Sequence, residues 1–318
     1  MPRVLLVKTS SLGDVVHNLP VVSDLVAMQP ALTIDWVVEE GFAAIPRLHP
    51  RVSRVLPVAV RRWRRAPWRS DVRAEVCSFL NDLRGAAYDA VIDTQGLLKS
   101  AWIARAAHGV RHGLDWSSSR EPLAWFYNHT HHVPWGLHAV ERNRSLAAQA
   151  MGYAITTPAR YGISAAAHEF SWLSRRSPHA VMLHATSAER KLWLEANWVE
   201  LGQTLAARGV VCVLPWGSQA ERLRSERLAQ QIPQAIVPVR MDLALLAPLI
   251  AQARVVIGTD TGLTHLAGAL EVPTVGLYCS TDPAATGLHA CARAVNLGGI
   301  GVIPAVSAVV EAVDGLLR

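Results

Sequence analysis

The chain has 318 residues, of which 51% are hydrophobic and 18% are charged. This composition excludes a disordered protein, and the length predicts two domains with cores of their own. The apolar runs are too short to span a bilayer and no signal-peptide core follows the start, so we expect a cytoplasmic protein.

The net charge of +6 is unevenly distributed along the chain. Residues 1–170 contain 19 Lys and Arg against 14 Asp and Glu, whereas residues 171–318 contain 12 against 11. The basic excess therefore belongs to the first half, where we expect any anionic partner to bind.

Short apolar runs alternate with helical patterns along the whole chain. In the first half this pattern predicts strands at 3–8, 33–38, 54–60 and 90–95 and helices at 15–29 and 73–86. In the second half it predicts strands at 179–186, 210–216, 235–239, 253–259 and 273–279 and helices at 195–209, 220–232 and 262–270. Such alternation is typical of parallel sheets covered on both faces. We therefore predict two doubly wound α/β domains, 1–165 and 166–318, facing each other across a cleft.

Ligands of such sheets bind beyond the carboxyl ends of the strands, so polar residues just after strands are the first candidates. The loop after the first strand, Lys8 to Asp14, has one glycine and lacks the G-x-G-x-x-G fingerprint, which argues against a dehydrogenase. Asp14 lies at the start of the next helix. It either caps that helix, an effect of about 1 kcal/mol, or faces a ligand.

Two strand ends of the second half also carry polar groups. Thr186 and Ser187 offer hydroxyls at one of them, and Lys191 can reach an anion bound there. At the other, Glu221 lies near a helix start, where it either caps the helix or accepts hydrogen bonds from sugar hydroxyls.

The segment VVIGTDTGLTHLAGAL (255–270) places Asp260, Thr261 and Gly262 between a strand and a helix. A helix N-terminus binds anions, and glycine lets a phosphate approach the backbone closely. Thr261 and His265 can donate to phosphate oxygens, while Asp260 either caps the helix or accepts from a sugar hydroxyl. This combination indicates a diphosphate attached to a sugar.

Several segments together resemble one family, the ADP-heptose:lipopolysaccharide heptosyltransferases of glycosyltransferase family 9. They are VKTSSLGDVVHNLP, VVEEGFAAIP, RRWRR, VIDTQGLLKSA, HATSAERKLW, LPWG and GTDTGLTHLAGAL. The run 37–65 is most similar to the heptosyltransferase I branch, which adds the first heptose to Kdo2-lipid A. The resemblance implies a GT-B fold of two Rossmann-like domains, no cofactor, and an inverting, metal-independent transfer of heptose from ADP-heptose to a Kdo residue of Kdo2-lipid A.

The resemblance also implies roles for single residues. Asp14 matches the proposed base of the family, and we add Lys191 as a second catalytic residue because it can stabilise the leaving diphosphate. The implied donor site, in the second domain, consists of Thr186, Ser187, Lys191, Glu221, Met241, Asp260, Thr261, Gly262 and His265. The sequence contains no D-x-D motif, which favours a metal-free reaction.

A basic run around Trp63 is the candidate for binding an anionic acceptor in the first domain. The run is either a solvated face or a contact with acidic sugars, lipid phosphates and an anionic membrane surface, where each basic residue contributes ~1 kcal/mol. The full set of acceptor candidates is Ser10, Arg61, Arg62, Arg64, Arg65, Gln95, Lys99 and Arg120.

Alternatives remain for both the partner and the reaction. A basic nucleic-acid-binding protein is one, but no helix-turn-helix, zinc-finger or RNA-binding motif is present. Heptosyltransferase II or another lipopolysaccharide core transferase is the other. The His-rich segment 128–138 lacks regular ligand spacing, so no metal site is predicted. The cysteines (Cys77, Cys212, Cys279 and Cys291) are predicted to be buried or half-buried thiols.

Overall fold

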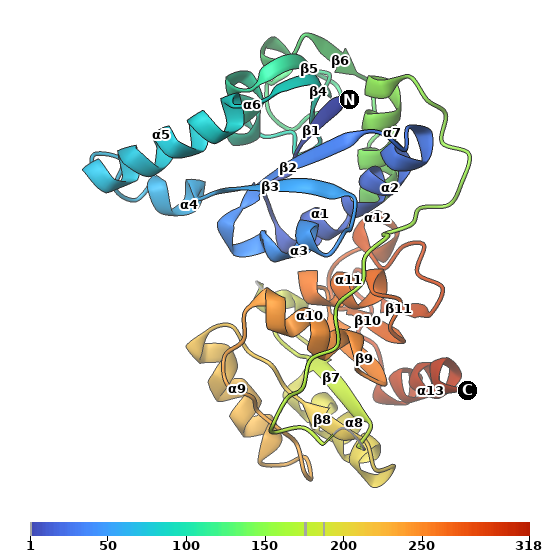
Figure 1. Cartoon of the computed structure of the whole chain (residues 1–318). Coiled ribbons are helices and arrows are strands. Elements are labelled where there is room, and N and C mark those ends of the chain that lie inside the picture. Colours follow the sequence, from blue (N-terminus) through green and yellow to red (C-terminus); the bar gives the residue numbers. More distant parts are fainter. Residues whose placement is uncertain (1, 175–176, 187) are drawn as a thin grey trace. The chain divides into compact units, whose positions relative to one another are not determined.

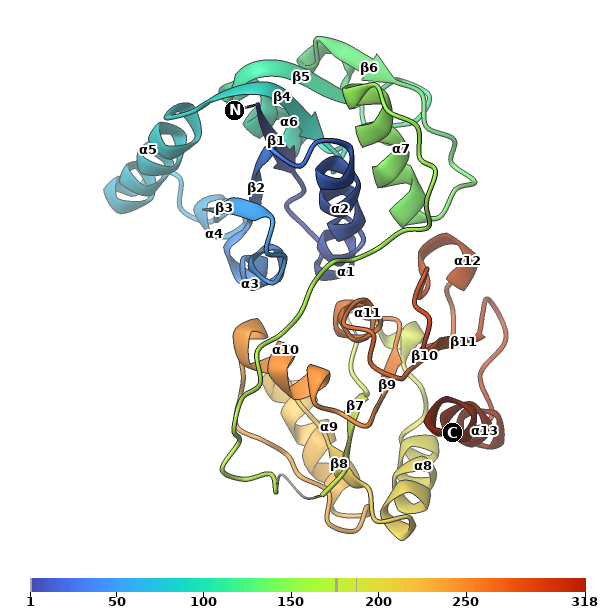
Figure 2. The same cartoon turned by 45° about the vertical axis from the view of Figure 1, so that its right-hand side comes forward.

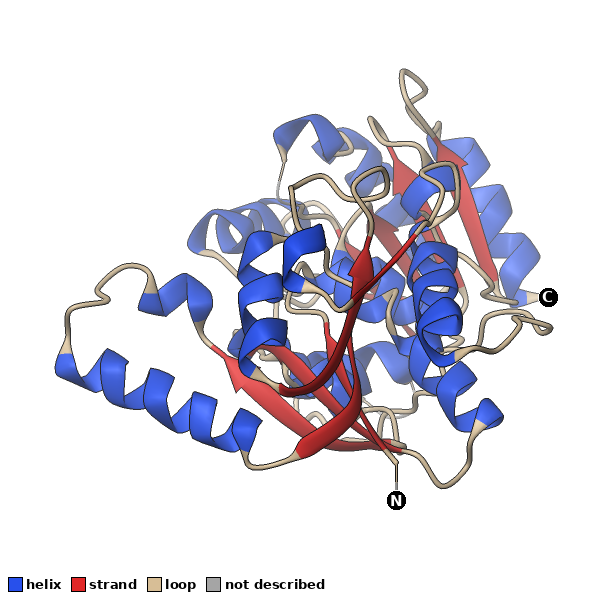
Figure 3. Ribbon diagram, turned by 90° about the horizontal axis from the view of Figure 1, so that it is seen from above, coloured by secondary structure: helices blue, strands red, loops and turns tan. Residues whose placement is uncertain are grey.

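The computed structural model describes residues 2–174, 177–186 and 188–318. The chain folds into two compact units, unit 1 (Met1–Ile163) and unit 2 (Ser164–Arg318). Each unit contains one sheet, shown in red in Figure 3. Ser187, one of the predicted donor residues, lies outside the described residues. None of the described helices is long and apolar enough to cross a membrane.

The sheet of unit 1 has six parallel strands in the order β3-β2-β1-β4-β5-β6 (Figure 1). These strands are β1 (Arg3–Val7), β2 (Thr33–Glu39), β3 (Val52–Val58), β4 (Ala87–Asp93), β5 (His108–Leu114) and β6 (His129–His131). The strand order reverses between β1 and β4. Doubly wound sheets bind ligands at this switch point, beyond the carboxyl ends of the two strands.

Helices cover both faces of this sheet. Successive residues of a strand point to opposite sides, and in β1 the residues on both sides are apolar and need covering. Leu5 and Val7 pack with Phe79 and Leu83 of α5, while Val4 points to the other face and is also buried. The helices are α1 (Leu12–Val16), α2 (Leu19–Met28), α3 (Ala44–Arg47), α4 (Val60–Trp63), α5 (Ser70–Arg84), α6 (Leu98–Ala106) and α7 (Ala139–Met151), with 3-10 turns η1 (Glu40–Phe42) and η2 (Ala124–Phe126). The prediction of a single helix at 15–29 is therefore wrong in part, because the structure has two helices there, α1 and α2.

The sheet of unit 2 has five parallel strands in the order β11-β10-β9-β7-β8 (Figure 2). These are β7 (His179–Leu183), β8 (Val211–Val213), β9 (Val255–Thr259), β10 (Thr274–Tyr278) and β11 (Ala294–Gly298). The strand predicted at 235–239 is wrong. Only Ile236 forms a bridge, to Val213, and Pro238 has no N–H with which to continue the ladder.

The helices of unit 2 also cover both faces of their sheet. Trp198 and Leu201 of α8 and Val309 and Val313 of α13 pack on one face, and α11 contacts β9 and β10 on the other. The elements are η3 (Glu189–Lys191), α8 (Glu195–Ala207), α9 (Gln219–Ala229), α10 (Leu243–Ala251), α11 (Gly262–Ala269), α12 (Pro283–Thr286) and α13 (Val306–Leu317). All four cysteines are free thiols. Cys77 is exposed, so the prediction that it is at least half-buried is wrong.

One glycine fixes the position of α11 against β9. A Cβ atom on Gly258 would lie 2.1 Å from Oγ1 of Thr264, so only glycine allows this close approach. The Thr264 hydroxyl uses the space to donate a hydrogen bond of 2.7 Å to the carbonyl oxygen of Thr259. The first turn of α11 is thereby held at the carboxyl end of β9.

Candidate active site

Asp260, the residue after β9, is the centre of a hydrogen-bonded group in unit 2. Its Oδ2 atom accepts from Nζ of Lys191 at 2.7 Å and from Oγ1 of Thr281 at 2.8 Å. Nε2 of His265 lies 3.4 Å from Oδ1, and Oγ1 of Thr186 donates to the main-chain oxygen at 3.1 Å. Three segments distant in sequence, 186–191, 260–265 and the loop after β10, therefore meet at Asp260.

These hydrogen bonds determine the ionisation of Asp260. Burial alone raises the pKa of this carboxyl, but the hydrogen bonds from His265, Lys191 and Thr281 outweigh burial and hold the pKa well below its usual range. The side chain is thus a carboxylate at neutral pH. It holds the Lys191 ammonium beside the start of α11.

Asp260 does not cap α11, so that part of the sequence interpretation is wrong. The N-cap is Thr261, with φ −144° and ψ 156°, and its side chain makes no capping hydrogen bond. The Thr264 N–H donates to the main-chain oxygen of Thr261. Among the described residues the N–H groups of Gly262 and Leu263 and the Thr261 hydroxyl have no such partner, and they are therefore available to an anion.

Two other predicted donor residues lie outside the Asp260 group. Glu221 forms a capping box at the start of α9: its Oε2 accepts from the N–H groups of Gly217 (2.7 Å) and Ser218 (3.2 Å). The capping interpretation of Glu221 is confirmed by these bonds, which leave its Oε1 for a ligand. Met241 is buried, 8% exposed, just before the N-cap of α10.

In unit 1, Gln95 links the loops that follow β1 and β4. Its Oε1 atom accepts from the N–H groups of Thr9 at 3.0 Å and of Ser10 at 2.9 Å. The Asp93 carboxylate in turn accepts from the Gln95 N–H at 2.9 Å. A left-handed Gly96, at φ +66°, completes this turn.

Lys99 and Asp14 lie at the same carboxyl-end region of the first sheet. The Lys99 ammonium donates to Oγ of Ser10. Burial and the nearby Arg61 lower the pKa of Lys99, while Glu39 and Asp14 act in the opposite direction. The predicted Ser10, Gln95, Lys99 and Asp14 are thus brought together.

Asp14 is the third residue of α1, whose N-cap is Ser11. Its Oδ2 atom accepts from the Ser11 N–H at 2.7 Å and from the Ser11 hydroxyl at 2.8 Å. Within the described part of the chain Oδ1 accepts no hydrogen bond, and the side chain is partly exposed. One carboxylate oxygen therefore stabilises the helix start and the other is open to a proton donor.

Two polar residues at the candidate sites are not among those predicted from the sequence. Thr281, which donates to Asp260, follows β10, so the rule that polar residues after strands gather at one end of the sheet identifies it. Lys8 is buried, 6% exposed, and donates to the oxygen of Thr94 at 2.8 Å and to Oδ1 of Asn143 at 3.2 Å. Burial lowers the pKa of Lys8, and the nearby Asp14 and Asp93 act against this shift.

The basic run around Trp63 is not uniform. Arg62 pairs with Glu40 at 3.0 Å and with Glu75 at 2.7 Å. The exposed guanidinium groups of Arg61, Arg64 and Arg65 form no ion pair with the residues that the structure describes. Arg61 and Arg64 are close enough to lower the pKa of Lys99. The unpaired charge therefore lies toward the loop that carries Asp14.

Arg120 lies with its guanidinium 5.8 Å from the ring centroid of Trp135. The adjacent His-rich segment forms ring contacts, with Nδ1 of His112 and Nε2 of His131 3.0 Å apart. Burial lowers the pKa of His112 to about 4, so this ring is neutral at pH 7. Among the described residues no three His, Cys, Asp or Glu side chains are arranged to hold a metal ion.

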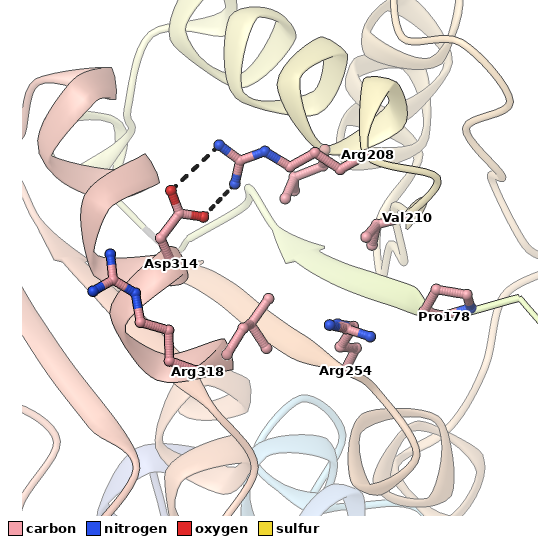
Figure 4. A pocket seen from close by; sticks show the side chains of 8 residues that line it. Pro178, Arg208, Val210, Arg254, Asp314 and Arg318 are labelled. Carbon is pink, nitrogen blue, oxygen red and sulfur yellow. Dashed lines mark hydrogen bonds and ion pairs between the residues drawn. The ribbon is translucent and has the colours of Figure 1, made fainter.

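A surface pocket of about 350 Å³ in unit 2 is lined by none of the candidate site residues (Figure 4). Pro178, Val210 and Arg254, which line it, directly precede β7, β8 and β9, so the pocket is at the amino ends of the strands. An ion pair between Arg208 and Asp314 joins α8 to α13 there. Because doubly wound sheets bind ligands at the opposite end, we assign this pocket no part in the site.

Comparison with known proteins identifies the family. Residues 76–305 match the family model described as glycosyltransferase family 9 (heptosyltransferase). Lipopolysaccharide heptosyltransferase 1 of Salmonella typhimurium is 47% identical over 289 residues, which are 90% of each chain. That of Pseudomonas aeruginosa is 47% identical over 299 residues, 93% of this chain and 83% of the other.

Solved structures agree with this assignment. The structure described as E. coli heptosyltransferase WaaC with ADP has a TM-score of 0.90 and 41% identity, with 99% of each chain covered. E. coli ADP-heptose lps heptosyltransferase II, at 20% identity and a TM-score of 0.76 over 99% of this chain and 98% of that one, shares the fold. The predicted GT-B fold and the family resemblance are confirmed: the chain is a transferase that belongs to glycosyltransferase family 9, the heptosyltransferases.

Proposed function

We propose that this protein transfers heptose from ADP-heptose to a Kdo residue of Kdo2-lipid A, with inversion and without a metal ion. The observation that carries the proposal is the Lys191–Asp260 pair beside the open first turn of α11. Two solved relatives support the donor, since they are described as WaaC with ADP and with ADP-2-deoxy-2-fluoro heptose. The curated relatives named lipopolysaccharide heptosyltransferase 1 support an acceptor that belongs to lipopolysaccharide.

The donor diphosphate fits the start of α11 in unit 2. The N–H groups of Gly262 and Leu263 and the Thr261 hydroxyl can donate to an anion bound there, and the helix dipole adds partial positive charge. Lys191, held by Asp260, neutralises charge that develops on the departing ADP. We assign Glu221, Met241, Thr186 and Ser187 to the nucleoside and sugar parts of the donor, and His265, with Thr261, to the diphosphate.

The acceptor hydroxyl belongs to unit 1 in this proposal. Asp14 takes the proton from that hydroxyl through Oδ1, and the oxygen then forms its bond to the anomeric carbon as the bond to ADP breaks. Attack from the face opposite the leaving group inverts the anomeric configuration. Ser10, Gln95, Lys99, Arg120 and the arginines of the basic run bind the carboxylates and phosphates of the acceptor.

The residues also support a metal-independent reaction. The chain has no D-x-D motif, and donors for the diphosphate are present in the Lys191 ammonium, which Asp260 holds, and in the α11 start with its partial positive charge. For a lipid acceptor, the unpaired Arg61, Arg64 and Arg65 would attract an anionic membrane surface, so we propose peripheral contact with the cytoplasmic face of the inner membrane.

Mass spectrometry of the lipid product tests the proposal directly. The protein is incubated with ADP-heptose and Kdo2-lipid A in EDTA, and a parallel reaction contains Mg²⁺. We expect a lipid heavier by one heptose in both, with an anomeric configuration opposite to that of the donor by NMR. Turnover only with Mg²⁺ would contradict the metal-free mechanism, and transfer only to an acceptor that already carries heptose would contradict the Kdo assignment.

A further inference from the structure

Unit 1 exposes a connected group of large aromatic side chains that the proposed chemistry does not use. Trp102, Trp116, Trp125 and Trp135 are 64%, 53%, 84% and 49% exposed. The rings of Trp116 and Trp125 are in edge contact at 5.6 Å, and those of Trp102 and Phe126 at 5.1 Å. Together with Leu98 these residues form what we call the aromatic patch. Contiguous exposed apolar surface of this kind marks an interaction site.

Local structure holds the patch in place. Its residues come from α6, η2 and the loops around 116 and 135, and α6 contacts η2. The indole Nε1 of Trp135 donates to the oxygen of Ser117 at 2.7 Å, which ties that loop to the one carrying Trp116. The patch is therefore a built surface rather than a set of unrelated side chains.

The charges around the patch distinguish between possible partners. Arg120 and Arg142 lie over the Trp135 ring at 5.8 and 4.2 Å, and the exposed Arg105 is one turn from Trp102 on α6. The nearby Glu121 accepts from the Leu98 N–H, and Asp115 accepts from Ser117 and Ser118, so both acids are already engaged. Indoles interspersed with guanidinium groups are typical of the interface between an anionic bilayer and water.

Helix α6 also connects the patch to the candidate acceptor residues. Leu98, Trp102 and Arg105 are spaced i, i+4 and i+7 and so share one face of the helix. Lys99, on the next position after Leu98, donates to Ser10 in the loop that leads to Asp14. If this face of α6 lies in the headgroup layer of a membrane, the acceptor residues are placed at the depth of sugars that are attached to lipid.

We propose that the aromatic patch is a membrane-contact surface of this protein, in addition to the basic run, and lies in the interfacial layer of an anionic bilayer. The inference deepens the proposed function, on which the link to a lipid acceptor rests. The inference that the patch binds a membrane rests only on the side chains of unit 1 and not on the proposed reaction.

Co-sedimentation with vesicles tests the proposal. The parent protein and Trp102→Gln/Trp125→Gln are compared on vesicles of phosphatidylglycerol and phosphatidylethanolamine and on vesicles of phosphatidylcholine alone. We expect the parent to prefer the anionic vesicles and the double variant to bind them at least tenfold more weakly. The matched control is Ile300→Gln/Ile303→Gln in unit 2, at side chains 74% and 59% exposed, which should bind like the parent.

A second pair of measurements separates a folding defect and a protein partner from lipid binding. Trp102→Tyr/Trp125→Tyr should restore most of the vesicle binding, because tyrosine shares the interfacial preference of tryptophan. Equal vesicle binding by the parent and the Gln variant would overturn the proposal. So would sedimentation in which the parent is a dimer and the Gln variant is a monomer, because the patch would then be a contact between two copies of the chain. Transfer to a deacylated, water-soluble acceptor should be unchanged in the Gln variant; if the parent itself lacks that activity, the proposed function fails while the vesicle result stands.

Discussion

The ammonium group of Lys191 lies 2.7 Å from Oδ2 of Asp260, and this ion pair is beside the first turn of α11. Lys191→Ala removes the charge that stabilises the departing diphosphate, so kcat/KM for ADP-heptose should fall by about 10²–10³. Arg190→Ala, an exposed neighbour in η3, is the matched control and should keep parent kinetics. Parent-like donor kinetics in Lys191→Ala would remove this residue from the site.

The hydrogen bonds to Asp260 predict a specific pH dependence of stability. The pKa of Asp260 in the folded protein is below the value of about 3.9 in an unfolded chain. Its ionised carboxylate therefore contributes fully to the free energy of unfolding above about pH 3.9, and this contribution is lost as the pH falls toward the pKa of the folded state. The difference in free energy of unfolding between the parent and Asp260→Asn should stay constant from pH 8 to 5 and shrink below pH 4. A difference that changes between pH 8 and 6 would show that another group controls the interaction.

Asp14→Asn separates the two roles of this carboxylate. The amide oxygen can still accept from the Ser11 N–H, so the melting temperature should barely change, while loss of the base should lower kcat by about 10²–10⁴. Asp14→Ala should lose the same activity and in addition about 1 kcal/mol of stability with the helix-start contact. Turnover of Asp14→Asn within a few-fold of the parent would place the base elsewhere.

Besides its proposed contact with the acceptor, Gln95 positions the loop before Asp14, and paired variants separate the two roles. Gln95→Leu leaves the N–H groups of Thr9 and Ser10 without their acceptor, at a cost of ~1–3 kcal/mol for a buried group. We expect kcat to fall at least tenfold, with recovery in Gln95→Glu, which keeps an acceptor oxygen. An increase in acceptor KM in both variants, with kcat unchanged, would instead show direct contact with the acceptor.

The uneven pairing within the basic run predicts unequal effects on the acceptor. Arg61→Ala/Arg64→Ala should raise the acceptor KM several-fold at low salt and less at high salt, with ADP affinity unchanged. Arg62→Ala should have a smaller effect, because Glu40 and Glu75 already neutralise that guanidinium. Equal effects of Arg62→Ala and Arg64→Ala, or loss of ADP binding, would contradict this assignment.

The sequence predicts most of the site because polar residues that follow buried strands must meet at one end of a parallel sheet. That rule identifies Asp14, Lys191, Asp260 and Thr261. It cannot predict that Asp260 binds Lys191 rather than capping α11, since this contact joins segments 69 residues apart.

The fold is predicted less completely, for identifiable reasons. β5 (HGVRHGL) and the three-residue β6 carry histidine and glycine where strand patterns expect branched apolar residues, so both were missed. The burial of Lys8 was also missed, because it depends on Thr94 and Asn143, 86 and 135 residues away. At 235–239 the apolar pattern is that of a strand, but Pro238 limits it to the single bridge at Ile236.

Three of the four outer strands that the structure describes, β3, β6 and β8, offer little backbone for pairing with another chain. β3, at one edge of the first sheet, contains Pro57, and β6 at the other edge has three residues. In the second sheet β8 is equally short and is partly covered by Ile236, with Pro238 two residues further along the chain. Short edges and prolines suppress edge-to-edge aggregation of sheets. These three edges are therefore poor templates for strand-mediated aggregation at high concentration.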